Sequence, residues 1–345
     1  MESDGDEDLV VDAQQRRGVA RTIAFITDDG RRPIVYRALA ELITIIYIAI
    51  ISFIAIATGA LYILFPELGA LSHDVFTRPR GTWACAPVLL AITPVITGAL
   101  GILVTRALPY GYFSVLLTVA GSVGVITALE SPVAPAISAG LLPLVLGVTS
   151  WWYPAGITLG TVLLAAMSVL WGLIAGEFLS IPPMSSGDRL EDAIERPAVG
   201  LNWFFALITF VAAAEFVVQM TGLRFVLFPP LVVIGFEMFG HTEICPWAKR
   251  PLVLPIACFL TAAGGLAFWK LFGVSPVTAG CSMAWGIVVL RFLDLHVPPA
   301  LAVALLPLVM DAPTIAYPIS VGTGTLLMML WFLAYQHFQN KFAFF

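Results

Sequence analysis

The chain has 345 residues, of which 59% are hydrophobic and only 11% charged, and its formal net charge is −5. A soluble domain carries about a quarter charged residues, so this composition excludes an ordinary soluble domain and predicts no nucleic-acid partner. The apolar runs do not alternate as barrel strands do, and they are rich in Leu, Ala, Ile and Gly. We therefore predict an all-α polytopic protein embedded in the lipid bilayer.

Residues 1–38 are predicted to form a cytoplasmic, partly disordered tail. The first dozen residues are acidic and contain no large apolar cluster, and six arginines follow before the first apolar run. The tail has no short apolar stretch with a small-residue cleavage site, so we expect no removable signal peptide. The positive-inside rule predicts that the arginines hold the N-terminus in the cytoplasm.

Apolar segments fill the chain on both sides of one densely charged connection. This connection, residues 178–200, is predicted to be a polar linker between a first membrane repeat (39–177) and a second (201–340). The apolar segments lie at 39–58, 59–76, 84–104, 110–129, 133–149 and 154–176, and then at 201–219, 221–240, 251–273, 275–292, 297–311 and 317–336.

The two repeats are predicted from an internal match. Glu130–Leu164 aligns with Asp294–Met328 at an offset of 164 without a gap, and 13 of the 35 positions are identical, among them a shared LLPLV and a Tyr-Pro pair. Leu64-Phe65-Pro66 matches Leu227-Phe228-Pro229 at an offset of 163. Many transporter folds are built from such duplicated halves, so the match favours gene duplication and fusion.

The number of spans in each repeat depends on the two Phe-Pro segments. If they cross the bilayer, each repeat has six spans and the halves are parallel; if they dip in and return, each has five and the halves are inverted. Of the 17 basic residues, the first arrangement leaves 14 inside and the second 12. The positive-inside rule thus favours parallel halves by a small margin, with ten to twelve spans overall and both termini in the cytoplasm.

A stretch in the second repeat resembles the HPP family of membrane proteins, which is named for a His-Pro-Pro motif. The resemblance rests on His296-Val-Pro298-Pro299-Ala300, the LLPLV that follows, and Tyr317-Pro318 with Gly322-Thr-Gly324. A valine separates His296 from Pro298, and the first repeat reads Ser131-Pro-Val-Ala-Pro135 without a histidine. The resemblance implies two fused HPP-like repeats and transport of an inorganic anion such as nitrite.

Prolines inside the apolar segments predict helices that break at membrane depth. Proline removes a backbone donor, and such breaks are tolerated where they line a cavity. The half-helices that follow would offer free N–H groups to an anion, and we expect four such N-termini to converge between the repeats. The alternative is that the prolines only kink the spans for packing. The predicted substrate pathway comprises Phe65, Pro66, Phe228, Pro229, Pro230, Glu237, Pro135, His296, Pro298 and Pro299.

Ionisable residues within the spans are candidates for proton coupling. Glu215 and Gln219 are four residues apart and share a helix face, Glu237 follows a Phe-Pro break, and His296 would titrate near neutral pH. A carboxylate inside a membrane is costly and indicates function by default. Three further carboxylates lie at predicted span ends and are expected at the interface: Glu130, Asp294 and Asp311.

No metal site, cofactor or enzyme is predicted. The four cysteines form no CxxC pattern, the four histidines are dispersed along the sequence, and His73 and His241 are expected in solvated loops. The sequence contains no HExxH, serine–histidine or paired-aspartate motif.

The sequence thus predicts a transporter or channel for a small solute, an inorganic anion such as nitrite, in a plasma (inner) membrane. The alternative is a membrane subunit that scaffolds a larger complex without moving solute. A homo-oligomer or another membrane partner stays open. The space between the repeats discriminates the two functions, since transport favours a polar crevice and a scaffold favours side chains that fill it.

Overall fold

The computed structural model describes residues 34–178, 184–250 and 252–342, and within these ranges the chain forms helices and no strand. Almost all of the predicted tail lies outside the described residues. The first part comprises α2 (Ile34–Thr58), η2 (Leu61–Ile63), α3 (Leu68–Thr77), α4 (Pro87–Ala107), α5 (Tyr112–Ala128), α6 (Ala136–Leu146) and α7 (Trp152–Phe178). The polar linker contains α8 (Ser186–Ile194). The second part comprises α9 (Asn202–Thr221), η3 (Arg224–Leu227), α10 (Pro229–Gly240), η4 (Pro246–Lys249), α11 (Val253–Phe272), α12 (Pro276–Phe292), α13 (Pro299–Leu305), η5 (Leu306–Leu308) and α14 (Ala316–Phe342).

Six of the described helices are long and apolar enough to cross a membrane: α2, α4, α7, α9, α11 and α14. In each of them the most apolar stretch of 18 residues is at most half buried within the protein. Large apolar side chains such as Phe53, Leu173 and Leu330 are instead exposed. Apolar surface on this scale is not tolerated in water. The helices therefore have the character expected of a polytopic membrane protein.

The two Phe-Pro segments and the two Pro-led segments are short helices, not continuous spans. Helices α3, α6, α10 and α13 contain 10, 11, 12 and 7 residues, whereas a straight span needs about 20. Their starts follow the prolines as predicted: Pro229 and Pro299 are first-turn residues, and Pro135 precedes α6. Proline suits these positions because a first-turn N–H has no partner within the helix.

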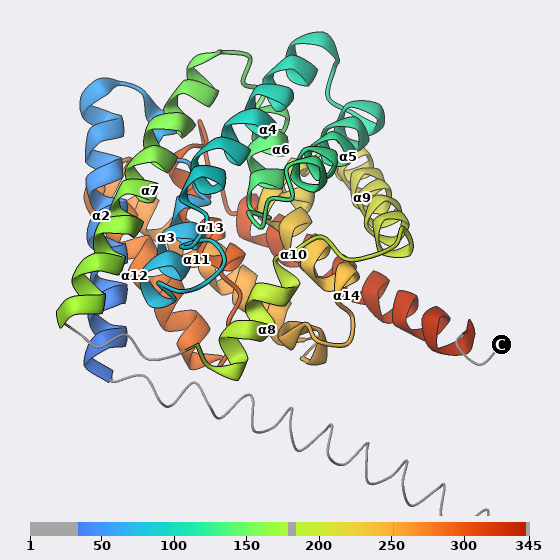
Figure 1. The fold of residues 1–345 in the computed structure, drawn as a ribbon. Helices are drawn as coiled ribbons and strands as arrows, with labels where there is room; N and C mark the ends of the chain where they lie inside the picture. The colour runs from blue at the N-terminus through green and yellow to red at the C-terminus, as the bar shows by residue number, and fades with distance from the viewer. Residues whose placement is uncertain (1–33, 179–183, 251, 343–345) are drawn as a thin grey trace, which may run out of the picture.

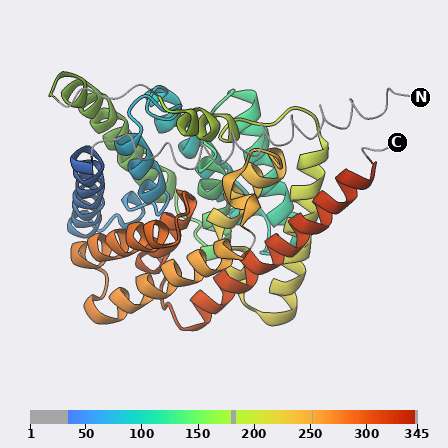
Figure 2. The ribbon, with the colours of Figure 1, turned by 90° about the horizontal axis from the view of Figure 1, so that it is seen from below.

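These four short helices form the interior of the bundle. Nearly all of their residues are buried, α3 packs on α13, α13 on α10, and α10 on α6. The long helices surround them, with α2 and α9 on opposite sides of the molecule in both views (Figures 1 and 2). The two parts of the chain meet through α2 against α12 and α5 against α9.

Both broken segments run from one end of the bundle to the other. At one end Tyr36, in the first turn of α2, donates a hydrogen bond to the carbonyl of Phe76 at the end of α3 (3.0 Å). At the other end Tyr62 of η2 meets Tyr153 at the start of α7 edge to face, with ring centroids 5.3 Å apart. In the second part Phe225 of η3 lies against Tyr317 at the same separation, and His241, directly after α10, contacts the carbonyl of Arg196 ahead of α9 (2.8 Å). The segments thus cross the bundle instead of turning back.

Candidate functional site

A buried arginine gathers carboxylates at the end of the bundle where the linker lies. Arg78 directly follows α3 and is only 3% exposed. Its guanidinium nitrogens lie 2.6 Å from Asp74 and 3.1 Å from both Glu191 and Asp192, and it also binds Glu195. We call these five residues the Arg78 cluster. The residue that follows α3 thereby anchors three side chains of the linker.

The linker presents these carboxylates because it forms a short, well-capped helix. Ser185 caps α8 by accepting a hydrogen bond from the backbone N–H of Asp188, while the Asp188 side chain accepts one from the N–H of Ser185. Glu191 and Glu195 are four residues apart, so they face the same side of the helix and reach Arg78 together. The carboxylates of the linker are therefore turned inward, whereas its two arginines, Arg189 and Arg196, are exposed.

Burial opposes the carboxylate charges of the cluster but does not remove the charge of Arg78. Burial raises the pKa of both Glu191 and Glu195, although the nearby Arg78 opposes this shift. Burial also disfavours the charge of Arg78, but Asp74, Glu195 and Glu191 more than offset it, and the pKa of Arg78 is raised well above its ordinary value. The cluster contains four carboxylates and one guanidinium, so it is short of positive charge.

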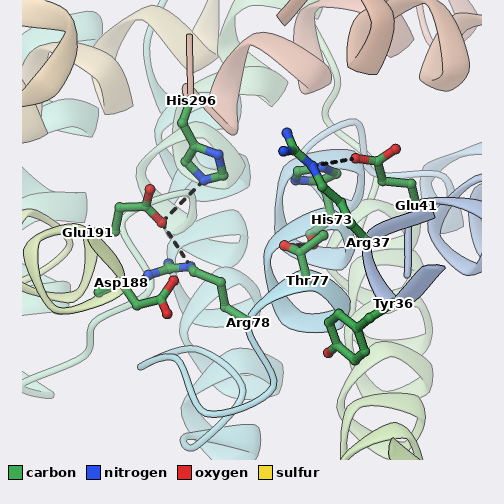
Figure 3. Close-up of a pocket in the computed structure, with 9 residues that line it drawn as sticks. All are labelled: Tyr36, Arg37, Glu41, His73, Thr77, Arg78, Asp188, Glu191 and His296. Carbon is green, nitrogen blue, oxygen red and sulfur yellow. Dashed lines mark hydrogen bonds and ion pairs between the residues drawn. The ribbon is translucent and has the colours of Figure 1, made fainter. Parts of the chain in front are cut away.

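A cavity of about 40 Å³ opens beside the cluster. Nine residues from α2, α3, the linker and the loop before α13 line it, among them His73, Arg78, Glu191 and His296 (Figure 3). Figure 3 shows Glu191 between His296 and Arg78, and the Nε2 atom of His296 lies 3.3 Å from Glu191 Oε2. A space of this size admits a water molecule or a small ion.

Three side chains at this end are close enough to share one ion. Asp74, Glu191 and His296 each offer a ligand atom, and these atoms lie within 4.8 Å of one another. His73 is also close, since its ring centroid is 6.0 Å from that of His296. Histidines that are dispersed in the sequence are thus neighbours in the fold, and His73 belongs to α3, not to a solvated loop.

A second buried carboxylate lies deeper in the bundle, where sequence analysis did not identify a site. Glu67 precedes the first turn of α3, is 1% exposed, and neither of its carboxylate oxygens has a hydrogen-bond partner among the described residues. The hydroxyl of Ser138 on α6 is close enough to interact with it, but the contact does not have the geometry of a hydrogen bond. The signal in the sequence that points to Glu67 is its position directly after the Phe-Pro break.

Apart from His296, the predicted pathway residues are buried, but the short helices do not present their N-termini at one point. Helices α3 and α13 are antiparallel: Gly69 lies beside Leu305, while His73 lies beside His296. The start of α3 therefore adjoins the far end of α13. The pathway prolines and phenylalanines are all buried in these segments: Phe65, Pro66, Pro135, Phe228, Pro229, Pro230, Pro298 and Pro299.

The predicted coupling residues are also separated. Glu237 is 2% exposed near the Arg78 cluster, interacts electrostatically with Asp74 and Arg78, and leaves its Oε2 atom without a hydrogen-bond partner in the described residues. Glu215 accepts a hydrogen bond from Tyr110 (3.0 Å) and another from Gln219. Only His296 and Glu237 thus approach the cluster. The carboxylates expected at the interface, Glu130, Asp294 and Asp311, are exposed.

No protein-family model, curated protein or solved structure matches this chain. The resemblance to the HPP family stays a prediction from the motifs quoted above.

Proposed function

We propose that this chain is a transporter or channel that moves a small solute between its two halves, along the four short central helices. An inorganic anion such as nitrite is the substrate class that the HPP-like motifs imply. The observation that carries the proposal is Glu67, a carboxylate without a hydrogen-bond partner in the described residues, buried where α3 begins and opposite Ser138 of α6.

Repeated geometry supports two related halves. Tyr153 donates a hydrogen bond to the carbonyl of Ala139, and Tyr317, at the matching position, donates one to the carbonyl of Val303. Glu130 and Asp294 both adopt a left-handed backbone, with φ of 48° and 49°. Residues other than glycine rarely do so, which makes coincidence a poor explanation. Together with the crossing of both broken segments, this favours six crossings in each HPP-like half and parallel halves, the arrangement of several carriers.

The position of Glu67 supports a coupling role for protons. An ionised carboxylate without partners is very costly in an apolar interior, so Glu67 is stable there only when it holds a proton or faces a ligand. A group that must change its charge or its partner within the bundle is what an ion-coupled carrier requires. Glu237 has one buried oxygen without a hydrogen-bond partner in the described residues, and Glu215 and His296 stay as further candidates.

Proton coupling also reconciles an anionic substrate with the charge of the site. The Arg78 cluster carries an excess of carboxylates, which repel an anion arriving at this end of the passage. An anion that travels with a proton is neutral overall and avoids this repulsion. We therefore expect flux to depend on the pH gradient as well as on the anion gradient.

Anion flux into proteoliposomes tests the proposal. Nitrite, nitrate, formate, chloride and bicarbonate are compared with and without an imposed pH gradient, against empty liposomes. We expect flux of one anion that the gradient accelerates, and we expect Glu67→Gln to remove this acceleration. Glu243→Gln, at an exposed position, is the matched control, and Pro298→Ala with Pro299→Ala should lower flux. Absence of flux for every anion, with folded and inserted protein, would overturn the proposal.

One observation favours the second candidate, a non-transporting scaffold. The central helices are closely packed: a Cβ atom at Gly101 would lie 2.0 Å from the carbonyl oxygen of Gly140, and one at Gly265 would lie 2.1 Å from that of Ala304. A scaffold needs only such packing, whereas a carrier must loosen it in each cycle. Flux in the liposome experiment decides between the two.

A further inference from the structure

We propose that Asp74, Glu191 and His296 bind one divalent transition-metal ion, such as Mn²⁺ or Zn²⁺, at the end of the bundle where the linker docks. The three ligand atoms lie within 4.8 Å of one another. They come from three separate elements, α3, α8 and the loop before α13. Metal binding here does not require that the chain transports a solute, so the inference goes beyond the function proposed above.

Asp74 provides the observation that points to a ligand. Its side chain is fully buried, and its Oδ1 atom accepts a hydrogen bond from the Nε atom of Arg78 (2.6 Å). Its Oδ2 atom is buried as well but has no hydrogen-bond partner in the part of the chain that the structure describes. A buried carboxylate oxygen without a partner is costly. A cation between Asp74 and the two other ligands would remove this cost.

The charge of the cluster also favours a bound cation. Four carboxylates share the guanidinium of Arg78. Two of them, Asp74 and Glu191, are proposed ligands. Buried charges are stable only when they are compensated. A divalent cation would supply the missing positive charge on the side of Asp74 and Glu191 that faces His296. Arg78 would stay bound to the cluster through Asp192 and Glu195.

The ligand set indicates the class of metal. One imidazole nitrogen with two carboxylate oxygens suits Zn²⁺, Mn²⁺ or Fe²⁺, whereas Mg²⁺ and Ca²⁺ prefer oxygen ligands alone. The side chain of His296 is 36% exposed and that of Glu191 is 18% exposed, so an ion can reach them from solution. The adjoining cavity of about 40 Å³ leaves room for water to complete the coordination.

Metal binding would lock the linker onto the bundle. Glu191 belongs to α8 of the linker, while Asp74 and His296 belong to the first and second halves. An ion held by all three joins the halves through the linker and stabilises the docked arrangement by the free energy of binding.

Direct metal binding to the tag-free, full-length protein tests this site. Protein in detergent is treated with a chelator, transferred to chelator-free buffer, and titrated with Mn²⁺ or Zn²⁺ alone in a calorimeter, and the bound metal is counted by elemental analysis. We expect one ion per chain, with affinity at least tenfold weaker in His296→Gln and in Asp74→Asn. Pulsed paramagnetic resonance of the Mn²⁺ complex should show coupling to an imidazole nitrogen that is absent in His296→Gln.

Two controls keep the test specific. His241→Gln removes a histidine that contacts the carbonyl of Arg196 outside the site (2.8 Å), and it should leave binding unchanged. His296→Gln replaces a partly exposed side chain, so it can be assayed even where Asp74→Asn fails to fold. No stoichiometric binding of either metal, or binding that His296→Gln does not weaken, would overturn the proposal. Because the assay needs no transport, its outcome is separate from that of the liposome experiment.

Discussion

The region 34–178 and the region 202–342 use the same contacts to pack their helices but carry different polar groups at the linker end. Gly101 lets α4 approach α6 as Gly265 lets α11 approach α13, and the tyrosine-to-carbonyl hydrogen bonds of α7 and α14 match in the same way. At the linker end, Asp74 and Arg78 stand where the second region has Glu237 and His241. Close helix contacts limit which residues fit in both regions, whereas the end that the linker covers is free to diverge.

The difference between the two regions at the linker end indicates where specific chemistry is expected. The shared positions are explained by packing alone, because a backbone oxygen at about 2 Å leaves no space for a side chain. The Arg78 cluster is not explained by packing, since an apolar contact would dock the linker at lower cost. We therefore expect the largest effects of mutation in the cluster, and matched effects at the shared positions.

The largest effect is predicted for Arg78→Gln. It leaves four carboxylates without their shared cation, and breaking a buried ion pair costs about 3–5 kcal/mol of unfolding free energy. Arg250→Gln is the control, since the Arg250 side chain is 39% exposed and pairs with the exposed Asp294 (3.3 Å). Exposed pairs contribute about 0–1 kcal/mol. Unfolding in mixed detergent and denaturant measures both, and equal losses would show that the cluster is no more important than a surface pair.

The next effect tests the likeness of the two regions. Gly101→Ala and Gly265→Ala each place a methyl group against a backbone oxygen, and we expect each to cost about 1–3 kcal/mol, or more where the helices cannot separate. Gly124→Ala and Gly172→Ala are controls, because nothing lies within 4 Å of the added Cβ atom. Thermal unfolding at a fixed scan rate compares the four variants. A large loss in one region and none in the other would contradict equivalent packing.

Much of the fold was predictable from the sequence, and most of the site was not. Helix starts at Pro229 and Pro299 follow from the backbone chemistry of proline, which acts locally. The cluster joins Arg78 to a linker more than a hundred residues later, and no local pattern encodes such a contact. The same holds for His73 and His296, which are dispersed in the sequence and neighbours in the fold. Glu67 was missed because a carboxylate beside a proline has the sequence appearance of a loop.

A smaller effect concerns the dependence of stability on pH, and it arises in the linker. The pKa of Glu195 is raised by burial, so the folded state holds this proton more tightly than the unfolded state does. Its contribution to stability is present below the ordinary glutamate pKa of about 4.3 and is lost as the pH rises through the raised value. We expect wild-type stability to decline as the pH rises from the ordinary glutamate pKa through the raised pKa of Glu195, and we expect Glu195→Gln to reduce this decline. Unfolding curves across this range measure it, with exposed Glu243→Gln as the unchanged control.

The smallest predicted effect tests where the two regions stop having matching contacts. Trp83 donates a hydrogen bond from Nε1 to the carbonyl of Pro132 (2.8 Å), whereas the Nε1 atom of Trp247, at the matching position, has no partner in the described residues. The carbonyl that corresponds to that of Pro132 is the one of His296. Trp83→Phe and Trp247→Phe remove the same volume, so their difference reports the hydrogen bond, and we expect Trp83→Phe to cost about 1 kcal/mol more. Equal losses would mean that Trp247 finds a partner, and that the loop of His296 follows the symmetry of the first region after all. A difference of the expected sign would place the departure from symmetry at the loop that carries His296, the residue that meets the linker.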